Sequence, residues 1–153
     1  MTKSIAKEMT KAPVRIGDQV AINEAKEVMQ MWGMRHLPVT NASDNLVGIL
    51  SDRDFSRLYN SNIKGTNPVS DIMTPNPFSV LPDTSLQTVV KEMAESKIGS
   101  TVIVNYNREV VGIFTTTDAM KVLAKLLEDD DDGEYRTLKI SEYLIRHKAL
   151  ATA

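Results

Sequence analysis

The chain has 153 residues, the length of one compact domain or of two small ones that share a core, and its net charge is −2 at pH 7. This slightly acidic balance, with basic residues scattered along the chain, argues against a nucleic-acid-binding face, which needs a basic cluster. The sequence contains no cysteine, which excludes disulfides and cysteine-based zinc sites and agrees with a reducing compartment. We find neither a basic-then-apolar leader nor an apolar run near the length of a membrane span, so we expect a cytoplasmic protein without a membrane partner.

The predicted elements follow an internal repeat. Residues 9–55 recur as residues 73–119 at a constant offset of 64 residues and without a gap. Two copies are too few for a solenoid, so we predict a pseudo-twofold pair packed face to face, with two related clefts. Each copy alone is marginal for an independent core, so we expect the packing of the two copies to be a condition of stability.

The first repeat, residues 5–60, is predicted to run strand, helix, strand, strand, helix. A short strand over 14–16 follows Pro13, and apolar spacing predicts a helix from about residue 20 to Trp32 that Gly33 ends. Two apolar runs, 37–40 and 46–50, flank a polar cluster and are typical of a hairpin. A second helix is expected over 52–59, followed by a polar linker over 61–68.

The second repeat, residues 69–127, is predicted to retrace this order, which gives an α/β (α+β) fold. The spacing Thr84-Ser85-Leu86-Gln87 predicts a capping box at the start of its first helix. A hairpin over 101–104 and 110–114 follows, and the last helix is expected over 116–127. That helix carries one apolar stripe, formed by Ala119, Met120, Leu123, Leu126 and Leu127.

Residues 128–153 are expected to hold an acidic run and a C-terminal tail. Five consecutive acids, Glu128 to Asp132, indicate a solvated linker, with a divalent-ion site as the weaker alternative. The stretch 135–150 is mildly amphipathic and is expected to form a short helix that docks on the body or on a partner.

Each repeat places a hydroxyl and a carboxylate where its third strand turns into its second helix. These pairs are Ser51 with Asp54 and Thr115 with Asp118. Their spacing is that of a helix cap. It also suits a nucleotide, because a helix N-terminus offers free N–H groups to phosphate and a carboxylate can accept two hydrogen bonds from a ribose diol. Both interpretations stay open, since they do not exclude each other.

The double repeat, the stretch Gly33-Met34-Arg35-His36-Leu37-Pro38-Val39 and the two Gly-h-h-Ser/Thr-x-x-Asp stretches resemble a tandem pair of CBS domains, a Bateman module. The resemblance covers about residues 5–127. It implies two α/β halves whose sheets pack together, with a cleft on each side of the pseudo-twofold axis. In family members these clefts hold adenine nucleotides (AMP, ADP, ATP) or adenosyl compounds.

The resemblance also implies roles for individual residues. Asp54 and Asp118 would contact ribose hydroxyls, while the hydroxyls that precede them would contact phosphate. The segment that enters the opposite repeat borders the adenine, which is Thr10–Arg15 for the Asp118 cleft and Thr74–Ser79 for the Asp54 cleft. The expected ligand-binding residues are therefore Thr10, Arg15, Arg35, Ser51, Arg53, Asp54, Thr74, Ser79, Thr115, Thr117 and Asp118.

The two clefts are expected to differ. Family members often carry a basic residue three positions before the strand proline, where it is aimed at phosphates near the axis; here it is Arg35, with a surface ion pair as its alternative role. The matching position in the second repeat is Gly99, and Arg53 has no basic counterpart there. We expect the Asp118 cleft, with Thr115, Thr117 and Arg35, to be the better nucleotide site.

Among function classes, an enzyme is disfavoured, because the only histidines are His36 and His147 and no cysteine is present. The leading hypothesis is a regulatory module that binds an adenine nucleotide or adenosyl compound, with or without Mg²⁺, and signals occupancy to an effector protein or through its own homodimer. A helical stripe of Val20, Val28 and Trp32 could serve that homodimer, although burial is the expected role for most of it. The alternative is a non-catalytic scaffold protein that has the same fold and binds no nucleotide. No cofactor is expected to be required.

Overall fold

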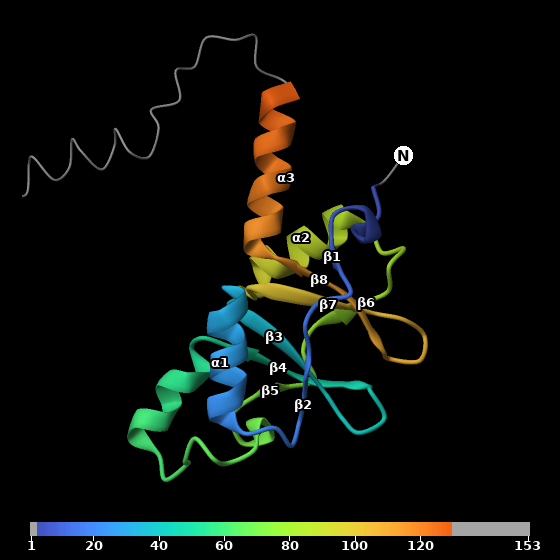
Figure 1. The fold of residues 1–153 in the computed structure, drawn as a ribbon. Coiled ribbons are helices and arrows are strands. Elements are labelled where there is room, and N and C mark those ends of the chain that lie inside the picture. Colours follow the sequence, from blue (N-terminus) through green and yellow to red (C-terminus); the bar gives the residue numbers. More distant parts are fainter. Residues whose placement is uncertain (1–2, 130–153) are drawn as a thin grey trace, which may run out of the picture. The chain divides into compact units, whose positions relative to one another are not determined.

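The computed structural model describes residues 3–129, apart from the side chains of Tyr59, Asn60 and Asp129, as a mixed α+β fold with two four-stranded sheets (Figure 1). One sheet has the strand order β2-β3-β4-β5 and the other β1-β8-β7-β6, which confirms the predicted fold class. Residues up to Val122 form one compact unit. The elements are η1 (Ile5–Lys7), β1 (Thr10–Lys11), β2 (Ile16–Gly17), α1 (Ile22–Trp32), β3 (His36–Thr40), β4 (Leu46–Ser51), η2 (Asp54–Asn60), η3 (Val69–Asp71), β5 (Thr74–Pro75), β6 (Ser79–Val80), α2 (Leu86–Glu95), β7 (Ser100–Val104), β8 (Val110–Thr115) and α3 (Thr116–Asp129).

Strand pairing repeats at the same offset as the sequence. In β3 and β4 His36 pairs with Ser51, and in β7 and β8 Ser100 pairs with Thr115. Both hairpins carry a register shift at equivalent points, and β2 and β6 each run parallel to the first strand of their hairpin. The backbone therefore has the pseudo-twofold symmetry that the repeat predicts.

The two halves exchange strands at their edges. β1 pairs antiparallel with β8, where Thr10 faces Ile113, and β5 pairs antiparallel with β4, where Thr74 faces Ile49. Each exchange depends on a glycine in the receiving strand, because a Cβ at Gly112 or Gly48 would collide with the methionine that precedes the incoming strand. The strand predicted over 14–16 is the two-residue β2 at Ile16–Gly17, and the separate β1 at Thr10–Lys11, which was not predicted, belongs to the other sheet.

Buried apolar side chains follow the same exchange. Ile5, at the N-terminus, is fully buried in a core with residues of α2, β7 and β8, although it belongs to the first repeat in sequence. Val69, its equivalent, is buried in the core of the first half under α1. The packed halves therefore differ from the sequence repeats, since each includes a short segment that leads into the other repeat.

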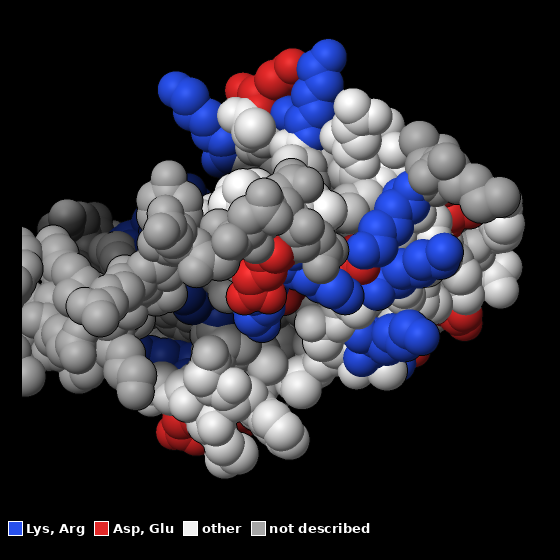
Figure 2. Space-filling model, turned by 90° about the horizontal axis from the view of Figure 1, so that it is seen from above, with Lys and Arg blue, Asp and Glu red and all other residues white. Residues whose placement is uncertain are grey.

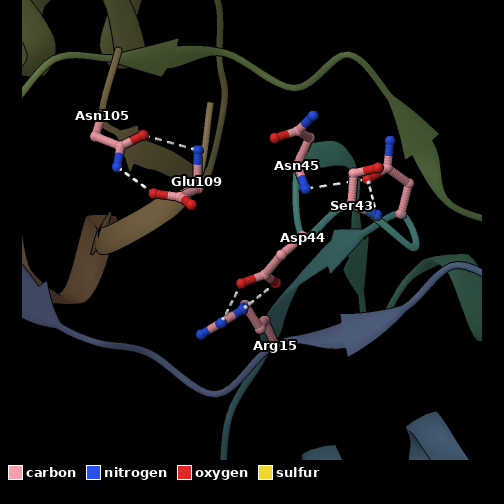
Figure 3. A network of polar contacts seen from close by, with 7 residues as sticks. Arg15, Ser43, Asp44, Asn45, Asn105 and Glu109 are labelled. Atoms are coloured by element: carbon pink, nitrogen blue, oxygen red, sulfur yellow. Dashed lines mark hydrogen bonds and ion pairs between the residues drawn. The ribbon is translucent and has the colours of Figure 1, made fainter. Parts of the chain in front are cut away.

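A third apolar cluster joins the sheets. It consists of Leu46, Ile49, Val102, Val104, Val110 and Ile113, all at most 9% exposed. At the hairpin turns the junction becomes polar: Asn45 bridges to Glu109, and Arg15 donates two hydrogen bonds to the carboxylate of Asp44, at 2.8 and 2.6 Å (Figure 3). The two copies thus share an apolar cluster, and the expectation that this packing is a condition of stability stays a prediction.

Several local predictions are confirmed and others are wrong. Gly33 ends α1 in the left-handed conformation, as predicted, and both hairpins lie where the apolar runs placed them. The helix expected over 52–59 is the 3-10 helix η2, and Ser85 caps α2 without a side-chain hydrogen bond, so the predicted capping box is absent.

The apolar stripes also differ from expectation. Met120 and three leucines of the α3 stripe are exposed by 46–63%, whereas Ala119 packs against the core of the second half. In α1, Val28 packs against the first core, as does Val20 ahead of it, which leaves Trp32 exposed at 64%. Among the described residues no helix is both long and apolar enough to cross a membrane. Most of the acidic run, the stretch 135–150 and His147 lie outside the described residues.

Candidate functional site

The candidate site occurs twice, at the turns from β4 into η2 and from β8 into α3. In the second half, Thr115 donates its backbone N–H (2.9 Å) and its hydroxyl (2.7 Å) to Oδ2 of Asp118. The Asp118 N–H donates back to the Thr115 hydroxyl at 3.3 Å, which completes a reciprocal cap. In the first half, Ser51 donates both groups to Oδ2 of Asp54, at 2.7 and 2.9 Å. The capping interpretation is therefore confirmed for Thr115 with Asp118. In the first half only the bonds from Ser51 to the acid form, and Arg53 precedes η2 without a side-chain cap bond.

The second oxygen of each carboxylate faces a cation that the sequence analysis did not single out. Oδ1 of Asp54 lies 3.5 Å from Nη1 of Arg57, and Oδ1 of Asp118 lies 3.6 Å from Nζ of Lys121. Arg57 and Lys121 are equivalent under the offset of 64 residues. A basic residue one helical turn after the acid in both repeats was the signal that could have identified them.

The two acids differ in accessibility. The side chain of Asp118 is 17% exposed and that of Asp54 only 4% exposed. The carboxylate of Asp118 is therefore the more accessible of the two, because the Asp54 carboxylate has little surface free for a new partner.

The exchanged strands bring two more of the expected residues near these turns. Thr10 faces Ile113, two residues before Thr115, and Thr74 faces Ile49, two residues before Ser51. Both threonines are exposed. Each turn is thus bordered by a strand from the opposite repeat, in the combination that the family resemblance implies.

Other expected residues lie elsewhere or are already engaged. Arg15 is held by Asp44, and this hydrogen-bonded ion pair raises the pKa of Arg15 and lowers the pKa of Asp44. Ser79 lies in β6, paired with Val102. Arg53 and Thr117 are exposed, each directly before the acid of its turn.

Near the axis the halves differ in charge. Arg35 is 73% exposed and forms a 3.4 Å ion pair with Asp52, as the alternative interpretation of this residue expected. His36 is half-buried against Gly99 of the other half, and a Cβ at Gly99 would approach Nε2 of His36 to 2.9 Å. Burial lowers the pKa of His36, which the nearby carboxylate of Asp52 partly opposes. The two basic side chains at this position come from the first repeat alone.

One further hollow, of about 390 Å³, lies between the end of α1 and η2, lined by Lys26, Met29, Gln30, Gly33, Met34, Arg35, Asp52, Phe55 and Ser56. None of the four residues of the hydroxyl–carboxylate pairs lines it. Within the described residues no group of three potential metal ligands is found.

Comparison with known proteins shows the family. The CBS domain model matches residues 3–61 and again 69–125, so the chain belongs to the CBS domain family and carries two copies. A structure of a protein from Vibrio cholerae assigned to acetoin utilization, AcuB, superposes with a TM-score of 0.77 at 28% identity, over 88% of this chain and 100% of that one.

Two related structures contain ligands. The CBS domain pair of protein MJ0100, in complex with 5′-methylthioadenosine and S-adenosyl-L-methionine, has a TM-score of 0.75 at 24% identity and covers 82% of this chain and 98% of its own. CBSX2 in complex with AMP has a TM-score of 0.73 at 24% identity, over 80% and 97% of the two chains. At this identity the likeness establishes the shared fold.

Curated relatives are much longer than this chain. It is 29% identical over 104 residues to a homoserine O-acetyltransferase from Methanosphaera stadtmanae, a match that covers 68% of this chain and 21% of the relative. The chain thus spans about a fifth of the length of the curated relatives it matches. The shared part is the CBS pair, a fragment of each of those proteins.

Proposed function

We propose that this CBS pair is a regulatory module that binds an adenine nucleotide or adenosyl compound, with its stronger site at Asp118. One observation carries the proposal: each half joins a strand-end hydroxyl, a carboxylate whose second oxygen contacts only an exposed cation, and an exchanged strand from the opposite repeat. The start of α3 offers backbone N–H groups and the exposed Thr117 to phosphate, while Asp118, oriented by the hydroxyl of Thr115, is the acid for the ribose diol. The adenosyl ligands of two structurally similar CBS pairs support this ligand class.

The order of the two sites follows from burial and charge. Ribose hydroxyls must reach the acid, and the Asp118 side chain is 17% exposed while that of Asp54 is 4% exposed. For Asp54, ligand entry requires a rearrangement of η2 or of its neighbours, which lowers the apparent affinity. The Asp118 site is therefore expected to fill first.

Occupancy is proposed to be signalled through assembly, as a homodimer or with an effector protein. The exposed Met31 (78%), Trp32 (64%) and Met120 (63%) support a protein contact on the helices, because large apolar side chains at such exposure are typical of interaction surfaces. Because the strand-end turn of each half leads directly into η2 or α3, a ligand at that turn acts on the start of a helix. Through this helix, ligand binding at the turn would change the protein contact.

The test is thermal unfolding of the full chain against AMP, ADP, ATP, S-adenosylmethionine and 5′-methylthioadenosine, each with and without Mg²⁺. A ligand at 100 times its dissociation constant adds about 2.7 kcal/mol, which raises the midpoint by roughly 5–10 °C. The rise should be lost in Asp118→Asn, reduced less in Asp54→Asn, and retained in the control Asp83→Asn, an exposed acid outside both turns.

The scaffold alternative predicts a different pattern. The protein would fold and assemble normally while its midpoint stays constant across all ligands and with Mg²⁺. Such a result contradicts the proposed function and directs the search to protein partners.

A further inference from the structure

In both halves, the carboxylate oxygen that accepts no hydrogen bond from the strand end lies close to a basic side chain. Oδ2 of each carboxylate accepts two hydrogen bonds from the strand end, while Oδ1 faces Arg57 in the first half (3.5 Å) and Lys121 in the second (3.6 Å). Neighbouring equivalent positions differ in chemistry, such as Arg53 and Thr117 or Phe55 and Ala119. A cation is thus present at the same point of both turns although the residues around it differ.

These cations add little to the stability of the turns. Arg57 is 68% exposed and Lys121 75% exposed, and exposed ion pairs of this kind contribute at most about 1 kcal/mol. The carboxylates are already oriented by the strand-end hydrogen bonds. The long side chains are consequently free to exchange one anion for another.

We propose that Arg57 and Lys121 are phosphate-binding residues that the motif acids hold in place until a ligand arrives. This inference rests on the proposed function. When a ribose diol takes Oδ1 of Asp118, the carboxylate is shared with the sugar hydroxyls and Lys121 is released toward the 5′-phosphate that the same ribose carries. Charge-assisted bonds to phosphate are stronger than the exposed ion pair that they replace.

The consequence is selection by charge. A 5′-phosphate gains the cation, an uncharged 5′-methylthio group gains nothing from it, and a sulfonium is repelled by it. Figure 2 shows Lys and Arg side chains, with Asp and Glu side chains among them, on the face seen from above. The inferred ligand class is a phosphorylated adenosine.

The experiment compares AMP with 5′-methylthioadenosine by titration calorimetry on the full chain and its variants. Lys121→Gln should weaken AMP binding about tenfold, the effect of one charged hydrogen bond, and leave 5′-methylthioadenosine binding unchanged. Lys121→Arg should retain AMP affinity. The matched control is Lys91→Gln, a 73% exposed lysine that pairs with Glu95 at 3.8 Å on α2 and lies in neither turn.

The possible results distinguish a failure of the phosphate role from a failure of the proposed adenosyl binding. If Lys121→Gln weakens both ligands equally, or neither, the phosphate role is overturned while adenosyl binding stands. Tighter binding of 5′-methylthioadenosine than of AMP by the wild-type protein overturns it as well. If the wild-type protein binds neither compound, this inference is overturned, and the proposed function fails with it when no other ligand of the thermal-unfolding panel raises the midpoint. A fall of AMP affinity with added salt, absent for 5′-methylthioadenosine, would support it further.

Discussion

The two halves of this protein share a backbone and differ in the side chains placed on it. Register shifts, strand exchange and left-handed residues recur at equivalent points, including Ala12 with Asn76 and Asp44 with Arg108. Yet Arg35 and His36 of the first repeat correspond to Gly99 and Ser100 of the second. The two halves share these backbone features, whereas their side chains near the axis and around the acids differ. The halves should therefore respond alike to changes in the scaffold and differently to changes in the site.

The largest expected effect tests the exchange of segments between halves. Ile5→Ala should lower the free energy of unfolding by about 2–5 kcal/mol, because it removes a fully buried side chain that packs under α2. Val69→Ala, at the equivalent point of the first half, should cost about 2 kcal/mol, since a valine loses less buried surface. Urea unfolding measures both.

The control for this pair is Met31→Ala, at a side chain that is 78% exposed, which should change stability by less than about 0.5 kcal/mol. If Ile5→Ala has an effect as small as the control, the N-terminal segment does not complete the core of the second half. The symmetry of the exchange would then be broken in solution.

The next effect concerns a buried difference between the halves. The hydroxyl of Thr101 is fully buried and finds no hydrogen-bond partner among residues 3–129, whereas the equivalent residue of the first half is Leu37. Thr101→Val should raise the free energy of unfolding by about 1–2 kcal/mol, because a buried unsatisfied hydroxyl is destabilising by that order. Thermal unfolding of the unliganded protein measures the gain.

The reverse change supplies the control. Leu37→Thr introduces the same hydroxyl into the first core and should destabilise the protein by at least about 2 kcal/mol. A loss of stability in Thr101→Val would contradict an unsatisfied Thr101 hydroxyl. It would indicate that a partner such as a buried water satisfies this hydroxyl.

How far the sequence predicts this molecule depends on whether a feature is local. The hairpins and the end of α1 at Gly33 were predicted because periodicity, turn residues and a left-handed glycine act within a few residues. The exchanged pairing of β1 with β8 was not, since two-residue strands carry no periodic signal and their partners lie about a hundred residues away. The roles of Ile5 and Val69 were missed for the same reason.

The candidate site shows the same division. Ser51 with Asp54 and Thr115 with Asp118 were identified because their spacing repeats, and the structure joins each pair by hydrogen bonds. The engagement of Arg15 by Asp44 depends on how the turn of β3 and β4 folds back toward β2, and no local pattern encodes it. The difference in burial between the two acids likewise arises from tertiary packing around η2 and α3.

A smaller effect is expected at the ends of α1 and α2. Gly33 and Lys97 are equivalent and both left-handed, with φ of 60° and 55°. Lys97→Gly should stabilise the protein by about 0.5 kcal/mol, because relief of the left-handed strain exceeds the added entropy of the unfolded chain. Gly33→Lys should cost about 1 kcal/mol, and a Cβ there meets no atom within 4 Å, so the loss would be conformational. Lys26→Gly, inside α1, is the control and should be destabilising. Stabilisation by both glycines would show that the φ angle is not the cause.

The smallest effect is a pH dependence that only the first half supplies. Burial against the second half lowers the pKa of His36 below 6.5, with Asp52 and Asp54 opposing and Arg35 and Arg53 reinforcing the shift. As the pH falls through 6.5, the unfolded chain binds a proton that the folded protein does not, so the free energy of unfolding decreases until the folded-state pKa is reached. Urea unfolding between about pH 7.5 and 5.5 should show a steeper decline for the wild type than for His36→Gln. The ion pair of Asp44 with Arg15 acts in a separate range, because a lowered carboxyl pKa stabilises above its unfolded value and is lost only as the pH falls below about 4. Equal slopes for wild type and variant would contradict the burial of His36, and with it the close contact of the halves at Gly99.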